Sequence, residues 1–315
     1  MIHTTPVNPN ATPEATALLQ YLHDIAGTNI LAGQHTQTNP MKEVAYIETV
    51  TGKSPKLCGF ELLAYSPNIR MEDASEACRV EVEENRNTMD TALRWANETG
   101  GIVTLTFHWF SPLGGHDKSF YTEHTDFDAE RVLHDGTPER AAFFHDLDAI
   151  AVQLQRFQDA KIPVLWRPFH EAEGTWFWWG AKGAEVAKQL YLLMYEYYVH
   201  HYHFDHLLWV WNSRLPEGYP GDDFVDVVSV DYEATDYAAD YQSLIAASNA
   251  NKVAALAEVG FLPDAALLAK SKIPWAYFMT WSKEFCIGET YNTKQRLKDV
   301  YNHERVLSQK PVLTK

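Results

Sequence analysis

Residues Ile162–Gly180 read IPVLWRPFHEAEGTWFWWG. The apolar start of this stretch has the composition of a buried strand, and it leads to Arg167, His170 and Glu171 within six residues. Four consecutive aromatic residues then follow at Trp176–Trp179. This order indicates a carboxylic acid beside a surface on which sugars can stack. The alternative is a core strand in which Arg167 and Glu171 form a structural ion pair, and the rest of the chain must decide between the two.

Short apolar runs of this kind recur along the 315 residues and alternate with segments of helical periodicity. The predicted strands are Asn29–Ala32, Leu57–Ala64, Gly101–His108, Ile162–His170, Leu207–Trp211, Val225–Tyr232, Val253–Glu258 and Trp275–Trp281. The predicted helices are Pro13–Ile25, Ser75–Thr99, Pro138–Ala160, Ala184–Tyr202, Asp236–Ala250, Pro263–Ser271 and Glu289–His303. Strands that alternate with helices predict parallel pairing through right-handed crossovers.

We therefore expect an α/β protein, a (β/α)8 TIM barrel that forms a single catalytic domain across residues 1–315. A doubly wound open sheet is the alternative architecture. No GxGxxG or GxxxxGK[ST] loop follows the first predicted strand, which disfavours that alternative.

Functional groups in such a barrel lie where the strands end. The predicted strand ends all present side chains that can hydrogen-bond to a sugar or stack on it: Gln34-His35, Glu61, His108-Trp109, His170-Glu171, Trp211-Asn212, Asp231-Tyr232, Glu258 and Trp281. Any single one could be a satisfied core residue, but their recurrence at equivalent positions favours a binding face.

Glu171 and Glu258 follow the fourth and seventh predicted strands and are the natural pair of catalytic carboxyl groups. Glycoside hydrolysis needs one carboxylic acid to protonate the leaving oxygen and a second carboxylate to attack the sugar or activate water. Side chains that reach inward from these two strands can approach the ~5–5.5 Å separation of a retaining enzyme.

Other chemistries have weaker support. HEAEG at residues 170–174 lacks the second histidine of HExxH, and no GxSxG elbow is present. The histidine-rich stretch 200–206 could bind a metal, but it precedes the fifth strand and so belongs to the opposite face of the barrel. We therefore expect neither a metal nor another cofactor. Glu81, Glu83 and Glu84 are expected to be solvated charges on a helix face.

The net charge of −16, without a cluster of Lys or Arg, disfavours nucleic acid and anionic membranes as partners and is compatible with a neutral polysaccharide. No run of 18 apolar residues predicts a membrane span. Cys58, Cys78 and Cys286 have neither disulfide-framework nor zinc-site spacing, so we expect small buried hydrophobic residues, with a single optional bridge as the alternative.

Five segments of the chain resemble glycoside hydrolase family 26. They are TFHW at Thr106–Trp109, RPFHEAEGTWFWWG at Arg167–Gly180, YPGDDFVDVV at Tyr219–Val228, AEVG at Ala257–Gly260 and YFMTW at Tyr277–Trp281. The resemblance covers nearly the whole chain. It implies a (β/α)8 barrel with a retaining mechanism, and activity as a β-mannanase for most members.

The same resemblance implies roles for individual residues. It implies that Glu171 is the general acid/base and Glu258 the nucleophile. It further implies that His108 and Trp281 contact the sugar being cleaved, that His170 and Trp176 shape its pocket, and that Tyr232 hydrogen-bonds the nucleophile. The chain departs from the family pattern at SVDYEA, because relatives usually have one residue between the Asp and the Tyr. Glu61, Trp109 and Arg167 complete the set of candidate substrate-binding residues.

Physical chemistry gives the two glutamates different requirements. A dry setting beside His170 and indole rings should raise the pKa of Glu171 and keep it protonated. Glu258 must stay ionised, which calls for donors such as Tyr232 or a nearby arginine. The long segment Phe110–Thr137 is expected either to form a wall of the cleft or to pack on the barrel as a surface loop.

We therefore expect a retaining endo-β-1,4-mannanase that acts on β-mannan, glucomannan or galactomannan as a monomer. Two alternatives remain: hydrolysis of mixed-linkage β-glucan or β-1,3-xylan by the same residues, and a carbohydrate-binding barrel without turnover. The resemblance implies secretion, whereas the N-terminal residues lack the pattern of a signal peptide, so a cytoplasmic location is the alternative.

Overall fold

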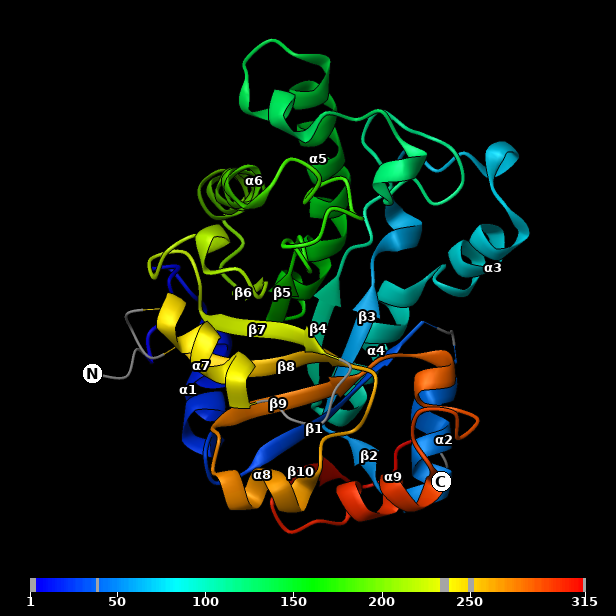
Figure 1. Cartoon of the computed structure of the whole chain (residues 1–315), viewed down its shortest axis with the longest axis vertical. Helices are drawn as coiled ribbons and strands as arrows, with labels where there is room; N and C mark the ends of the chain where they lie inside the picture. The colour runs from blue at the N-terminus through cyan, green and yellow to red at the C-terminus, as the bar shows by residue number, and fades with distance from the viewer. Residues whose placement is uncertain (1–3, 38–39, 233–237, 249–251, 314–315) are drawn as a thin grey trace.

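A closed barrel of eight parallel strands lies at the centre of the computed structural model, which describes residues 4–37, 40–232, 238–248 and 252–313 (Figure 1). The barrel strands are β1 (Ile30–Thr36), β3 (Leu57–Glu61), β4 (Ile102–Thr106), β5 (Val164–Arg167), β6 (Leu207–Asn212), β7 (Val227–Tyr232), β8 (Val253–Val259) and β9 (Trp275–Thr280). Each pairs in parallel with the next, and β1 pairs with β9 through Leu31 and Tyr277, which closes the ring. The predicted (β/α)8 barrel is confirmed.

Helices surround the barrel on its outside (Figure 1). They are α1 (Pro13–Ile25), α2 (Lys42–Thr51), α3 (Glu76–Glu84), α4 (Thr88–Thr99), α5 (Pro138–Asp159), α6 (Ala184–Glu196), α7 (Ala238–Ala247), α8 (Ala265–Ser271) and α9 (Lys294–Tyr301). Thr12 and Thr137 cap α1 and α5, since each side chain accepts a backbone N–H of the first turn, and a proline follows each cap. Gly27, at φ 84°, follows the end of α1 as predicted.

Some boundaries differ from the prediction. The predicted helix Ser75–Thr99 is two helices, because Asn85 ends α3 and Asn87 adopts a left-handed φ of 62° that a continuous helix cannot contain. Helix α2 was not predicted, nor were the short strands β2 (Ser54–Pro55) and β10 (Val306–Gln309) beside the barrel. The predicted helix Asp236–Ala250 extends into positions that lie outside the described residues.

Apolar side chains fill the barrel and also pack between its strands and the outer helices. Leu18, Leu19 and Leu22 of α1 form one cluster with barrel residues such as Leu165 and Leu208. A second cluster lies largely between the strands and the outer helices. The three cysteines are buried and free, as expected.

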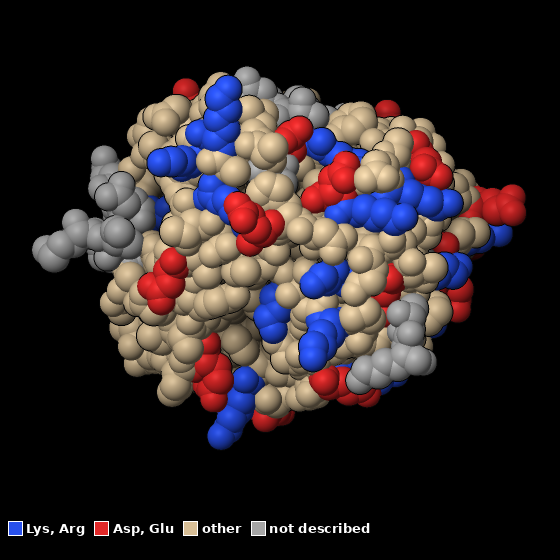
Figure 2. Space-filling view, turned by 90° about the horizontal axis from the view of Figure 1, so that it is seen from below, with Lys and Arg blue, Asp and Glu red and all other residues tan. Residues whose placement is uncertain are grey.

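Charged side chains of both signs lie on the face that includes α8, β10 and α9. Figure 2 shows Lys and Arg on this face interspersed with Asp and Glu, among the residues that the structure describes. None of the helices in the described residues is both long and apolar enough to span a membrane.

The segment that follows β4 helps to build the site. Phe120 and Tyr121 from this segment line a cleft, and Tyr121 forms an isolated bridge with Phe177 of the loop after β5. Phe127 instead packs on Trp178. The segment therefore forms a wall of the cleft on one side and packs on the loop after β5 on the other.

Candidate active site

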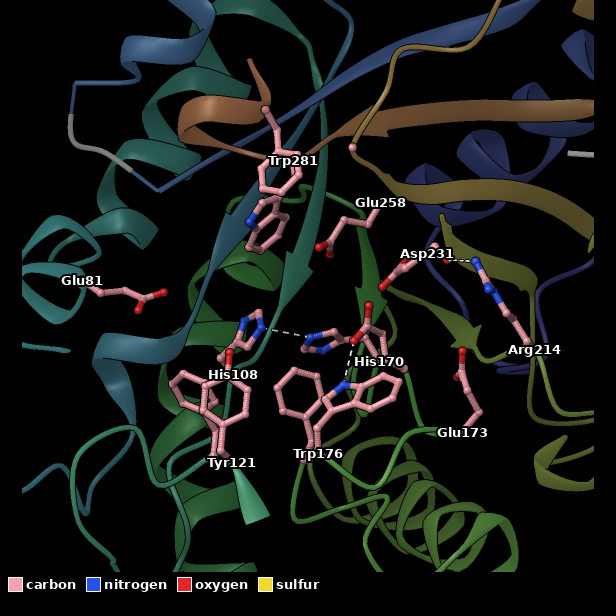
Figure 3. Close-up of a pocket in the computed structure, with 15 residues that line it drawn as sticks. Glu81, His108, Tyr121, His170, Glu173, Trp176, Arg214, Asp231, Glu258 and Trp281 are labelled. Atoms are coloured by element: carbon pink, nitrogen blue, oxygen red, sulfur yellow. Dashed lines mark hydrogen bonds between the residues drawn. The ribbon is translucent and has the colours of Figure 1, made fainter. Parts of the chain in front are cut away.

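A cleft of about 600 Å³ opens where the barrel strands end. Six of the predicted site residues line it: His108, His170, Glu171, Trp176, Glu258 and Trp281. Figure 3 labels all of these except Glu171. Three other predicted residues, Glu61, Trp109 and Arg167, are buried and do not line it. Tyr232 ends β7, but its side chain lies outside the described part of the structure.

Glu171 is held by its backbone as well as by its side chain. Its φ of 52° lies in the left-handed region, which is uncommon for a residue with a side chain. Its N–H donates to Oδ1 of Asn212 at 2.7 Å, and its carbonyl accepts from the N–H of Gly174 at 2.9 Å. The indole N–H of Trp176 donates to its Oε2 at 2.9 Å, the contact dashed in Figure 3. This turn directs the carboxyl group into the cleft.

Arg167 lies beneath the cleft and pairs with two other carboxylates. Nη1 donates to Oδ2 of Asp231 at 2.5 Å, and Nη2 donates to Oε2 of Glu258 at 2.7 Å and to the Thr106 hydroxyl at 3.1 Å. The guanidinium is fully buried, whereas 17% of the Glu258 side chain is exposed. The alternative ion pair between Arg167 and Glu171 is therefore wrong, and the expected arginine donor to Glu258 is present.

Three carboxyl groups thus lie close together, and two of them, Asp231 and Glu258, share one cation. Burial, followed by the charge of Asp231, raises the pKa of Glu171 to about 7, although the Trp176 bond opposes the rise. Burial and the charges of Asp231 and Glu171 also raise the pKa of Glu258, and Arg167 opposes that rise. Because Arg167 bonds to Asp231 and Glu258 but not to Glu171, its charge favours the ionised form of those two. The arrangement favours Glu171 as the carboxyl group that keeps a proton at neutral pH.

Two histidines lie side by side in the cleft. Nδ1 of the His108 ring lies 2.7 Å from Oε2 of Glu61, and the backbone N–H of His108 donates to Oε1 of the same carboxylate at 2.8 Å. Burial alone would lower the pKa of His108, but Glu61 raises it overall. Nε2 of His108 lies 3.1 Å from Nε2 of His170, whose pKa burial lowers well below its ordinary value. Glu61 therefore orients His108 from beneath and is a supporting residue.

The aromatic run after Glu171 divides between the cleft and the interior. Trp176 is 47% exposed at the cleft, whereas Trp178 and Trp179 are buried. The indole N–H of Trp178 donates to the carbonyl of Trp109, and that of Trp179 donates to the carbonyl of His170. Phe177 both lines the cleft and stacks on Tyr121.

Trp109 is a correction to the prediction. Its side chain is 1% exposed and packs on Phe143 and Trp178, and its indole N–H donates to Asp146 at 2.7 Å. The physical reason is alternation: His108 points into the cleft, so the next side chain points outward between the barrel and α5.

Several lining residues were not among the predicted site residues. Glu81 lines the cleft and pairs with Lys118, so the expectation that it is a solvated charge is wrong. Asp231, Glu173 and Arg214 also line it. Asp231 stood among the predicted strand ends, and Glu173 is two positions after Glu171, which puts it in the same loop.

Within the described residues, no group of three or more His, Cys, Asp or Glu side chains is arranged to hold a metal ion. Asp231 and Glu258 of the cleft pair with Arg167, and Glu171 accepts from the indole of Trp176.

Comparisons with known proteins give a consistent answer. The family model described as "Glycosyl hydrolase family 26" matches residues 7–311. A protein of Thermothelomyces thermophilus named mannan endo-1,4-beta-mannosidase is 41% identical over 314 residues, which are 96% of this chain and 62% of that protein.

Two solved structures are similar along the whole chain. The GH26-CBM35 β-(1,4)-mannanase of Podospora anserina has a TM-score of 0.88 and 39% identity, covering 98% of this chain and 68% of that one. A β-mannanase from a symbiotic protist of the termite Reticulitermes speratus, complexed with gluco-manno-oligosaccharide, has a TM-score of 0.84 and 30% identity, covering 98% and 97%. The chain spans between 50% and 62% of the length of three curated relatives that it matches.

Proposed function

The chain belongs to glycosyl hydrolase family 26, and from this premise we propose that it is a retaining endo-β-1,4-mannanase. Its substrates are β-mannan, glucomannan or galactomannan. The name of the Thermothelomyces relative and the oligosaccharide bound to the protist enzyme support this choice of polymer. The described part of the chain contains both carboxyl groups and the whole barrel, which supports residues 1–315 as one catalytic domain.

The observation that supports the proposal best is the unequal environment of the two glutamates. Glu258 accepts a hydrogen bond from Arg167, and Glu171 accepts one from the uncharged indole of Trp176. An ionised carboxylate and a protonated carboxylic acid in one cleft are the two groups that a glycosidase needs.

In the first step the Oε of Glu258 attacks the anomeric carbon while the proton of Glu171 moves to the glycosidic oxygen. The bond between that carbon and that oxygen breaks, the shortened chain leaves as an alcohol, and a glycosyl ester forms on Glu258. In the second step Glu171, now ionised, takes a proton from water as the water oxygen attacks the same carbon. The ester breaks, Glu258 is released as a carboxylate, and the configuration is retained.

The surrounding side chains suit a sugar at this position. Trp281 offers the face of an indole ring, and His108 offers a ring nitrogen oriented by Glu61. Trp176 adds a second exposed ring beside Glu171. No step requires a metal or another cofactor. The enzyme is proposed to act as a monomer.

The proposal is tested by measuring reducing ends released from mannan, barley β-glucan and β-1,3-xylan. We expect the highest kcat/KM on mannan, together with a rapid fall in viscosity, because internal cleavage shortens chains early. A higher kcat/KM on β-glucan or β-1,3-xylan would show that mannan is not the preferred substrate and would leave the proposed mechanism unchanged. Binding of mannan without any release of reducing ends would instead support a carbohydrate-binding barrel.

A further inference from the structure

Glu173 and Arg214 occupy one end of the cleft. Both line it, and Figure 3 shows them beyond Asp231, on the side away from His108, Tyr121 and Glu81. Glu173 follows Glu171 in the loop after β5, and Arg214 follows the end of β6. The chemistry proposed above uses neither residue.

These two side chains are not a closed structural ion pair. Nη2 of Arg214 donates to the carbonyl of Asp231 at 2.8 Å, which fixes the guanidinium beside the cleft. No direct bond from Arg214 to Glu173 is present among the described contacts, and Oε2 of Glu173 has no protein partner there. A carboxylate oxygen that is buried without a donor is costly, and a bound ligand can supply that donor.

The burial of Glu173 also acts on its pKa. Burial, more than any other cause, raises the pKa of Glu173, and the charge of Asp231 adds to the rise. The Ser213 hydroxyl and the charge of Arg214 oppose it. A carboxylate in this position gains from hydroxyl donors that approach from the cleft.

The role of Glu173 and Arg214 in the proposed reaction follows from the residues on the other side of the catalytic carboxyl groups. If Trp281 and His108 hold the sugar whose bond is broken, groups beyond the catalytic carboxyls meet the part of the chain that leaves. An acceptor from Glu173 and a donor from Arg214 match the two capacities of a sugar hydroxyl. An uncharged, hydroxyl-rich ring is the ligand chemistry that fits.

We propose that Glu173 and Arg214 form a binding site for the first sugar of the leaving fragment, with Glu173 accepting from its hydroxyls. The same site holds the acceptor when a sugar, in place of water, attacks the glycosyl ester. This inference rests on the proposed glycosidase function, and the test distinguishes a failure of the inference from a failure of that function.

The test compares two substrates of the whole chain. Mannopentaose has a sugar as its leaving group, whereas an aryl β-mannobioside has none. Glu173→Ala should lower kcat/KM on mannopentaose by about 10- to 100-fold, the range expected for a charged hydrogen bond. Its kcat/KM on the aryl substrate should stay within about threefold of the parent, which also shows that the variant is folded. Glu173→Gln, which keeps an acceptor oxygen without the charge, should lose less.

A matched control is Glu217→Gln, because Glu217 is exposed in the turn after Arg214 and does not line the cleft. This variant should keep the kcat/KM of the parent on both substrates. With mannobiose added as acceptor, Glu173→Ala should also form less transfer product per hydrolysis event. Equal losses of Glu173→Ala on both substrates, or no loss on mannopentaose, would overturn the inference. A parent chain that cleaves neither substrate would overturn the proposed function instead.

Discussion

The backbone N–H of Glu171 donates to Oδ1 of Asn212 at 2.7 Å, and Nδ2 of Asn212 donates to Oδ1 of Asp231 at 2.8 Å. One amide at the end of β6 therefore connects two carboxyl residues of the cleft. Glu171 has a left-handed backbone, which costs free energy unless its surroundings hold it. Asn212 is fully buried, so both bonds form away from water.

Asn212→Ala should lower kcat/KM on mannan by about 10- to 100-fold, because it leaves the Glu171 N–H without its partner and removes the donor to Oδ1 of Asp231, which keeps only its pair with Arg167. The melting temperature should also fall. Steady-state kinetics and thermal unfolding measure the two effects. Asn302→Ala, at an exposed site after α9, is the control and should change neither quantity. A normal kcat/KM in Asn212→Ala would show that the backbone of Glu171 needs no such support.

Glu171→Ala and Glu258→Ala should each lower turnover on mannan by at least about 10²- to 10⁴-fold, since each removes a group that acts on the reacting bond. The two variants should form different products from an aryl β-mannobioside in the presence of azide. Azide should restore turnover in Glu171→Ala with a β-linked glycosyl azide, because Glu258 still forms the ester. In Glu258→Ala it should give the α-linked product by direct attack. Product NMR distinguishes the two, and reversed products would exchange the assigned roles.

The alkaline limb of kcat/KM should have an apparent pKa near 7, the pKa to which burial and Asp231 raise Glu171. The acid must be protonated before the bond breaks, so activity falls as pH rises through this value. The value belongs to the coupled carboxyl groups together. Trp176→Phe removes a bond that lowers the pKa of Glu171, so it should move the limb to higher pH. Asp231→Asn removes a charge that raises it and should move the limb to lower pH; shifts of opposite sign would contradict the assignment.

Much of the fold could be predicted from the sequence because the signals are local. Apolar runs such as residues 207–211 alternate with periodic helices, and Thr12 and Thr137 are recognisable caps. The break between α3 and α4 is less visible, because it depends on the left-handed backbone of Asn87. Helix α2 begins at Lys42, and the preceding Met41 makes no side-chain capping bond, so the usual start signal is absent.

The position of the site could be predicted from the sequence, but the hydrogen bonds and ion pairs among its side chains could not. Strand ends identify Glu171 and Glu258, since a parallel barrel gathers them on one face. The choice of Arg167 between Glu171, Asp231 and Glu258 depends on side-chain directions across three strands, and no sequence spacing encodes it. Trp109 shows the same limit, because one step along the chain changes the face on which a side chain lies.

His35 stacks on Trp281 with ring centroids 4.0 Å apart and planes inclined by 24°. Neither ring nitrogen has a hydrogen-bond partner in the described part of the chain, and burial, helped by the charge of Arg167, lowers the pKa of His35, so the ring is neutral. His35→Phe should therefore keep kcat/KM within about threefold. His35→Ala should raise KM, because Trp281 loses its support, and should cost roughly 2–4 kcal/mol of stability through the cavity. Loss of kcat in a folded His35→Phe variant would point to a chemical role for the imidazole.

Arg167→Met should cost about 3–5 kcal/mol of stability at neutral pH, because it leaves Asp231 and Glu258 buried without their cation. Without Arg167 the folded-state pKa of both carboxyls rises further above the unfolded value. The folded state then binds more protons than the unfolded state, so stability declines as pH rises through that window. The deficit relative to the parent should consequently be smaller at pH 5 than at pH 8 in urea unfolding. Arg296→Met, which removes a partly exposed pair with Asp264, should cost less than about 1 kcal/mol. Equal costs for the two arginine variants, without any dependence on pH, would show that the buried guanidinium does not hold these carboxylates in their ionised form.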